Sequence, residues 1–189
     1  MKYLFPLTLS IILLSCSQQT ISYKEINHRT DASKEIVKEF STKLKTQLQQ
    51  AMKTGGPLNA IKICHEQAPI IAKELSTKTG WSISRTSLKP RVQKPDAWET
   101  RMMNAFEKQH VDGDAFKYLF VQDIVEIDNK PAFRYMQAIE TKQVCLLCHG
   151  ENIAPEVAGK IKQLYPSDTA TGFKLGDIRG SFSIVQSLD

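Results

Sequence analysis

The sequence predicts an α+β domain in which helices come first and an antiparallel sheet follows. Apolar residues recur at helical spacing up to about residue 111, and from about residue 118 they alternate as they do in strands. The order of these two patterns favours segregated helices and strands over a βαβ arrangement. Even without a leader of 15 residues, the 189-residue chain is long enough for one domain with its own core.

The first 15 residues, MKYLFPLTLSIILLS, contain an apolar run that is too short to span a bilayer and is typical of an export signal. The segment that ends at Cys16 resembles the lipobox of bacterial lipoproteins, in which the cysteine is lipidated and becomes the first mature residue. We therefore expect residues 1–15 to be a lipoprotein signal peptide and residues 16–30 a polar tether. A secretory signal followed by an incidental cysteine is the alternative.

This leader predicts a lipid-anchored protein of the cell envelope that faces the periplasm. Because Ser17 and not aspartate follows Cys16, the outer membrane is expected if the cell has two membranes. The net charge of +5 is spread over the chain with no dense basic run, so nucleic acid is not an expected partner.

Three helices are predicted before the sheet. The first covers residues 31–52 with Asp31 as its N-cap, and Gly55-Gly56 ends it. The second covers residues 57–76 and is closed by Gly80, with a kink or break expected at Pro69. The third begins at a capping box formed by Asp96 and Glu99 and ends near residue 111.

Four strand-like stretches complete the predicted domain, which covers residues 31–189. The first, residues 81–88, lies between the second and third helices, and a turn at residues 128–131 joins the next two. A short helix is expected at residues 155–164. The last strand should place Ile178, Phe182 and Ile184 on one side. The four predicted strands cover residues 81–88, 118–127, 132–139 and 177–188.

The motif Cys145-Leu146-Leu147-Cys148-His149 matches C-x-x-C-H, the spacing that attaches a c-type haem. Two thiols bond to the haem vinyl groups, and the adjacent imidazole binds the iron from a single turn of chain. One such motif predicts one covalent haem, with Cys145 and Cys148 as its anchors and His149 as the proximal ligand.

Two other functions remain open for this motif. A redox dithiol would have its cysteines at a helix N-terminus in a βαβ unit, which the flanking pattern does not favour. A zinc site would need a fourth ligand, and Cys64 could supply it.

The residue on the other side of a haem iron cannot be chosen from these patterns alone. Cys64 lies on an apolar helical stripe with Ile61 and Ala68, which also suits a buried core cysteine. The iron could equally lack a second ligand. The full set of candidates is Cys64, His65, Met102, Met103, His110 and Met136.

Four segments of the chain resemble a bacterial domain-of-unknown-function family of c-type haem proteins with a PAS-like fold, known structurally from a cyanobacterial member. The segments lie in the family's order over roughly residues 35 to 187. They are Ala60–Pro69, Arg85–Lys89 with Pro95–Glu99, Cys145–Gly150, and Tyr165-Pro166 through Gly176–Gly180.

The resemblance implies a PAS-like antiparallel sheet flanked by helices, with His149 and Cys64 as the two axial ligands. Arg85, Lys89 and Arg91 are then expected near the haem propionates, because cations stabilise buried carboxylates; a solvated basic loop is the alternative. The chain departs from the family at residues 90–94, where an asparagine- and proline-rich stretch is usual, so contacts there are in doubt.

Histidine and thiolate together would saturate the iron and lower its reduction potential. Redox or gas sensing with an unidentified signalling partner is one expected function, and low-potential electron transfer to a redox partner is the other. An open-site haem enzyme is the remaining alternative, together with an exported dithiol protein, and the iron's saturation argues against catalysis.

Overall fold

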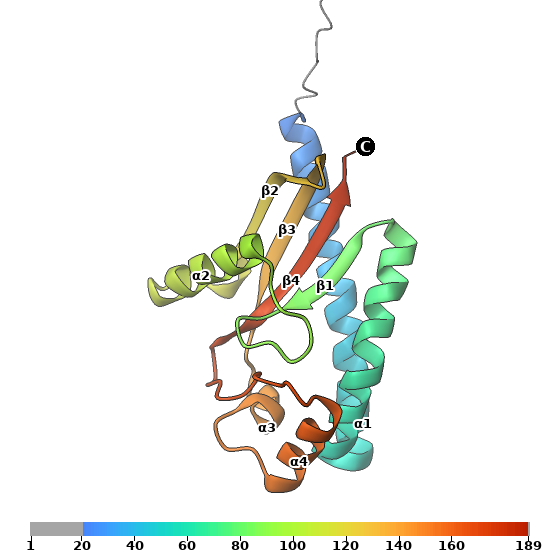
Figure 1. The fold of residues 1–189 in the computed structure, drawn as a ribbon, viewed down its shortest axis with the longest axis vertical. Helices are drawn as coiled ribbons and strands as arrows, with labels where there is room; N and C mark the ends of the chain where they lie inside the picture. The colour runs from blue at the N-terminus through green and yellow to red at the C-terminus, as the bar shows by residue number, and fades with distance from the viewer. Residues whose placement is uncertain (1–20, 189) are drawn as a thin grey trace, which may run out of the picture.

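The computed structural model describes residues 21–188 (Figure 1). The predicted signal peptide and the lipidation site Cys16 lie outside the described residues, so both stay predictions. Within the described part, no helix is long and apolar enough to cross a membrane.

Helix α1 (Tyr23–Thr79) is a hairpin of two helical arms. Gly55 and Gly56 leave the helical conformation, and the positive φ of 62° at Gly56 favours glycine there. The arms then lie side by side (Figure 1), where Lys78 pairs with Glu39 at 2.9 Å. The second arm ends as predicted at Gly80, whose N–H donates to the Ser76 carbonyl.

Two predictions about these arms were wrong. The helix begins at Tyr23 with Ser22 as its N-cap, so residues 23–30 of the predicted tether are helical. Those turns pack on the sheet, where Arg29 donates to Gln186 and Gln186 donates to Ser33. Pro69 does not interrupt the second arm, because its ring lies on the exposed face while Ala68 and Ile71 beside it are buried.

The sheet has four antiparallel strands in the order β1-β4-β3-β2. They are β1 (Ser82–Thr86), β2 (Phe120–Ile127), β3 (Lys130–Glu140) and β4 (Ile178–Ser187). The turn between β2 and β3 is the pair Asp128 and Asn129, both with positive φ, as a type I′ hairpin requires. Strand β3 therefore begins at Lys130, two residues before its predicted start.

Helices cover both faces of the sheet. On one face, Phe40 and Leu75 of α1 pack against Phe133, Tyr135 and Ile184. On the other face lies α2 (Ala97–Val111), which begins at the predicted Asp96–Glu99 capping box. The predicted α+β class with a PAS-like antiparallel sheet flanked by helices is confirmed.

Strand β4 has a bulge where it leaves the sheet. Ile139 pairs with Gly180 and Glu140 pairs with Ile178, so Arg179 has no partner on β3. The bulge reverses the alternation, and Ile178 packs with α2 while Phe182 and Ile184 face α1. The prediction that these three residues share one side was therefore wrong.

The remaining elements gather at one end of the sheet. They are η1 (Phe116–Tyr118), η2 (Gln143–Cys145), α3 (Leu146–His149) and α4 (Pro155–Leu164). Helices α3 and α4 lie beyond the lower end of the strands, beside α1 (Figure 1). Ile61 of α1 packs there against Val157 and Ile161 of α4, whose bounds match the predicted short helix.

Candidate haem site

Cys64 lies on the second arm of α1, on its apolar stripe. Ile61, Ala68 and Ile71 of the stripe are buried, and Cys64 itself is half-buried, facing the end of the sheet. The neighbouring His65 is exposed and meets the ring of Tyr165 edge-on, with centroids 5.0 Å apart. Helical geometry thus turns the thiol inward and the imidazole outward, as the sequence predicts.

The C-x-x-C-H segment follows β3 through η2 and forms the single turn α3. Cys145 and Cys148 are free, half-buried thiols. Gly150 closes the turn by donating to the Leu146 carbonyl, and a Cβ at this position would lie 2.6 Å from that oxygen. Backbone bonds from Gly172 to Gly150 and from Phe173 to His149 then tie α3 to the chain before β4.

His149 is held as a neutral imidazole. Its Nδ1 lies 2.7 Å from the Ala170 carbonyl oxygen, which can only accept, so Nδ1 carries the proton and Nε2 keeps its lone pair. Burial lowers the pKa of His149 well below its ordinary value, and the charges of Arg179 and Arg91 lower it further. A neutral imidazole with a free Nε2 is the form that binds a metal.

A hydrogen-bonded chain supports the Ala170 carbonyl from behind. Arg91 forms a two-point ion pair with Asp168, at 2.8 and 3.2 Å, and the same carboxylate accepts from the Ala170 N–H. Arg91 also donates to the Cys148 carbonyl at 3.0 Å. One arginine therefore connects the C-x-x-C-H turn with the loop that orients His149.

The three cysteine thiols interact electrostatically, although Cys64 is far from the other two in sequence. Burial raises the pKa of Cys64, the nearby arginines oppose that rise, and Cys145 adds to it. Burial also raises the pKa of Cys148, with a further contribution from Cys64. The fold thus places the predicted attachment residues and the predicted distal ligand at one site.

Three arginines surround these thiols, and one of them was missed in the sequence. Arg85 and Arg91, which were expected near haem propionates, each weaken the rise in the pKa of Cys64, so both lie near this thiol. The third is Arg179, which acts on Cys64 and on His149. It belongs to the Gly176–Gly180 motif, and its position depends on the bulge, which an alternating pattern does not reveal.

A family model described as Tll0287-like matches residues 18–187. The chain belongs to the Tll0287-like family. It also matches the crystal structure of the cyanobacterial haem protein Tll0287 with a TM-score of 0.62 and 23% identity, covering 89% of this chain and 98% of that one. At this identity the likeness shows a shared fold. Among curated protein sequences, none matches this chain.

In this Tll0287-like domain the methionine candidates lie elsewhere. Met103 and Met136 are buried between α2 and the sheet, and Met102 packs beside them, whereas Cys148 packs with the Ile61 cluster under α4. His110 is half-buried against the Phe116 ring, with ring centroids 4.8 Å apart, and its Nδ1 has no hydrogen-bond partner among residues 21–188. The order of the elements thus separates these candidates from Cys145 and Cys148.

The two other chemistries considered for the motif receive little support from this Tll0287-like structure. Within residues 21–188, no three histidine, cysteine or acidic side chains lie close enough together to bind one ion directly. Cys64 and the C-x-x-C-H residues thus share a site but do not form a zinc ligand set. The turn α3 has only four residues, and burial raises the pKa of Cys148. A redox dithiol is activated at the N-terminus of a longer helix, which the turn α3 does not provide.

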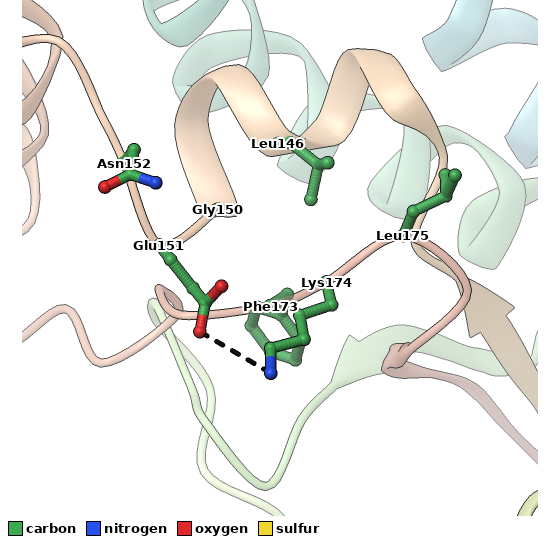
Figure 2. A pocket seen from close by; sticks show the side chains of 7 residues that line it. All are labelled: Leu146, Gly150, Glu151, Asn152, Phe173, Lys174 and Leu175. Carbon is green, nitrogen blue, oxygen red and sulfur yellow. Dashed lines mark ion pairs between the residues drawn. The ribbon is translucent and has the colours of Figure 1, made fainter.

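Lys89 and a small pocket lie on the outer side of the motif. The Lys89 ammonium is 3.4 Å from the carbonyls of Thr171 and Gly172 and sits over the Phe173 ring. The pocket, of about 270 Å³, lies between α3 and the segment that carries Phe173 (Figure 2). Lys174 and Glu151 pair across its edge at 3.9 Å. This volume is below the usual range for ligand pockets.

Proposed function

We propose that the protein is a single-haem c-type haem protein of the cell envelope. Cys145 and Cys148 would form the thioether bonds, His149 would be the proximal ligand and Cys64 the distal ligand. The domain would act in low-potential electron transfer or in redox or ligand sensing. Membership of the Tll0287-like family, in which Tll0287 itself is a haem protein, supports this proposal.

The observation that carries the proposal is the meeting of Cys64 with the C-x-x-C-H turn. The thiol comes from α1 and the other residues from η2 and α3, yet Cys148 packs against the cluster that contains Ile61, one helical turn before Cys64. A core cysteine would need no such neighbours. A second axial ligand for a haem held by α3 would have to come from another element, and Cys64 would supply it.

The side chains around this meeting point fit a haem in two further respects. His149 is neutral with its Nε2 free, as an iron ligand must be. The Nε of Arg179 is buried and has no hydrogen-bond partner in the described part of the chain, so the site presents cationic groups to an anion such as a propionate. Phe173 and Tyr165 add aromatic walls next to these charges.

A bound haem supplies one-electron redox chemistry, and the chain's own residues set its conditions. The Ala170 carbonyl fixes the tautomer and direction of His149, while Arg91 holds the attachment turn to the Asp168 loop. A thiolate from Cys64 would stabilise the ferric state and lower the reduction potential. With both axial positions occupied by protein, electron transfer and sensing are favoured over catalysis on substrate.

The test is the ferric absorption spectrum of protein produced together with a haem-attachment system. We expect the wild type to show low-spin thiolate features and to keep its haem after acid–acetone extraction. Cys64→Ala should lose the thiolate features and keep the haem, and the double variant Cys145→Ser/Cys148→Ser should lose covalent haem. Ile61→Val, a small change in the same cluster, serves as the control and should leave the spectrum unchanged.

Each part of the proposal can fail separately in this experiment. Wild-type protein that carries no haem would refute a haem function altogether. Haem that is removed by extraction would refute covalent attachment. Identical wild-type and Cys64→Ala spectra would refute the distal role of Cys64.

Carbon monoxide separates the two physiological roles. If the reduced wild-type protein binds CO at low concentration, the distal ligand leaves on reduction and sensing is supported. If the reduced protein excludes CO as long as Cys64 is present, the iron stays closed and electron transfer is supported. Cys64→Ala provides the open-site reference for both cases.

We propose the location from the sequence, with Cys16 as the lipid anchor. Cys16→Ala should move the haem-loaded protein from the membrane fraction to the soluble fraction after cell lysis. If the variant stays in the membrane fraction, the anchor assignment fails and the haem assignment is unaffected.

A further inference from the structure

The positive charges at the site are only partly compensated by the protein. Arg91 forms an ion pair with Asp168. Both side chains are largely buried, with exposed fractions of 12% for Arg91 and 7% for Asp168. Arg85 and Arg179 have no carboxylate within ion-pair distance among residues 21–188; each instead lies near an aromatic ring, that of Phe40 and of Phe173 respectively. Two guanidinium groups are therefore left without an anion.

These two guanidinium groups are only partly enclosed by the protein, since Arg179 is half-buried and Arg85 is exposed. The side chain of Arg85 is reached by solvent, yet burial among protein atoms is the main cause that lowers its pKa. Burial also lowers the pKa of Arg179 to about 10, and the charges of Arg91 and Arg85 add to the effect. Uncompensated cations so placed are costly unless a bound anion pairs with them.

The backbone around Arg179 is built to aim this side chain at the site. Arg179 is the extra residue of the β4 bulge, and Ser87 holds its carbonyl through a 2.9 Å hydrogen bond. The next residue, Gly180, has a φ of 154°, and a Cβ there would lie 2.3 Å from the Thr86 carbonyl oxygen. Bulges are often found where a strand directs a side chain to a functional site.

We infer that Arg85 and Arg179 bind the two carboxylates of the haem, one each, and that Arg91 is a positioning residue. This inference rests on the proposed function and revises the predicted trio of Arg85, Lys89 and Arg91. A haem carries two propionates, which match the two unpaired guanidinium groups in number and sign. Arg91 is already committed to Asp168 and the Cys148 carbonyl, and Lys89 to the carbonyls of the 171–172 segment.

The test is redox-difference infrared spectroscopy of the matured, full-length protein, with the haem labelled by ¹³C at its propionate carboxyl carbons. The wild type should show two labelled carboxylate bands. Arg85→Met should shift one band and Arg179→Met the other. Each substitution removes one charged hydrogen-bond donor and replaces it with an uncharged side chain of similar length. Arg91→Met should leave both bands in place, and Arg101→Met on the exposed face of α2 is the matched surface control.

Arg179→Lys is a second variant, which keeps the positive charge but lacks the planar guanidinium group. The carboxylate band that shifts in Arg179→Met should shift less in Arg179→Lys. Labelled bands that are unchanged in Arg179→Met would overturn the inference while the haem function stands. Equal shifts in Arg91→Met and Arg179→Met would overturn the division of roles. Wild-type protein without any haem would overturn the proposed function and this inference together.

Discussion

Two arginine clusters at different places on the sheet have opposite charge balances. On the α2 face, Arg134 contacts Asp96 at 2.8 Å and Glu99 at 3.3 Å, and its guanidinium lies over the Trp98 ring. At the end of the sheet, Arg85 and Arg179 have aromatic neighbours but no paired carboxylate. Both clusters combine arginine with aromatic rings, so only the carboxylates distinguish them.

The comparison separates an interaction that completes the fold from one that is prepared for a ligand. Arg134 lies on β3 and joins the N-terminus of α2 to the sheet, so its ion pairs stabilise the fold itself. Arg85 and Arg179 form no ion pair with the described residues, and they come from strand positions next to the C-x-x-C-H turn. Neighbouring cations that the fold leaves without a carboxylate are evidence for an anionic ligand.

The largest expected effect is a loss of stability at the α2 cluster, in which Arg134 is paired with Asp96 and Glu99. Arg134→Met should lower the free energy of unfolding by about 3–5 kcal/mol, because the buried Glu99 carboxylate loses its charge partner. Urea denaturation of the haem-free protein measures it, with Arg101→Met as the exposed control. A loss of about 1 kcal/mol or less would mean that the α2 cluster is not the completed one.

A smaller loss of stability is expected at the ion pair of Arg91 and Asp168, which lies within the candidate haem site. Asp168→Asn should cost about 2 kcal/mol, since Arg91 loses a charged partner but the amide can still accept from Ala170. In matured protein the same change should broaden the electron paramagnetic resonance of the ferric haem, because the loop that orients His149 loosens. An unchanged resonance would show that Arg91 and Asp168 do not position the imidazole.

The next prediction contrasts the stability of the haem-free and haem-loaded protein when the charge of Arg179 is removed. Arg179→Met in haem-free protein should change the free energy of unfolding by about 1 kcal/mol or less, and in the stabilising direction, because an unpaired buried cation is removed. In haem-loaded protein the same variant should be destabilised. Urea denaturation of both forms gives the comparison, and equal changes in the two forms would remove the basis for a ligand-binding role.

The smallest effect is a pH dependence at the complete cluster. The pKa of Asp96 is lowered by the Glu99 backbone N–H and by Arg134, against the opposing effect of burial. A carboxyl whose pKa is lower when folded contributes stability above its unfolded pKa, about 3.9, and this is lost as pH falls through the folded value. Asp96→Asn keeps the N-cap and should therefore differ from wild type near neutral pH and converge with it in acid.

The expected difference is below about 1 kcal/mol, because the Asp96 side chain is 53% exposed and solvent screens the pair. Urea midpoints measured from neutral pH down to about pH 3 provide the test. A difference that stays constant over this range would show that the ionised carboxylate adds nothing beyond the cap.

Local patterns predicted the elements whose causes are local. The glycine break at residues 55–56, the capping box of α2, the bounds of α4 and the inward turn of Cys64 all follow from a few neighbouring residues. The start of α1 was mispredicted because its first turns are polar and are held by β4, more than 150 residues away. The effect of Pro69 was mispredicted for a similar reason, since packing on both sides keeps the arm continuous.

The sequence by itself determined the fold class, the C-x-x-C-H motif of Cys145, Cys148 and His149 and the candidacy of Cys64, because periodicity and spacing are properties of the chain. Only the tertiary structure decided which cations have partners. Arg85, Arg91, Arg134 and Arg179 look alike in sequence, but Arg91 finds Asp168 and Arg134 finds Asp96 and Glu99 through long-range contacts. Whether a charge is satisfied depends on what folding places around it, and for Arg179 this was set by a single extra residue in β4.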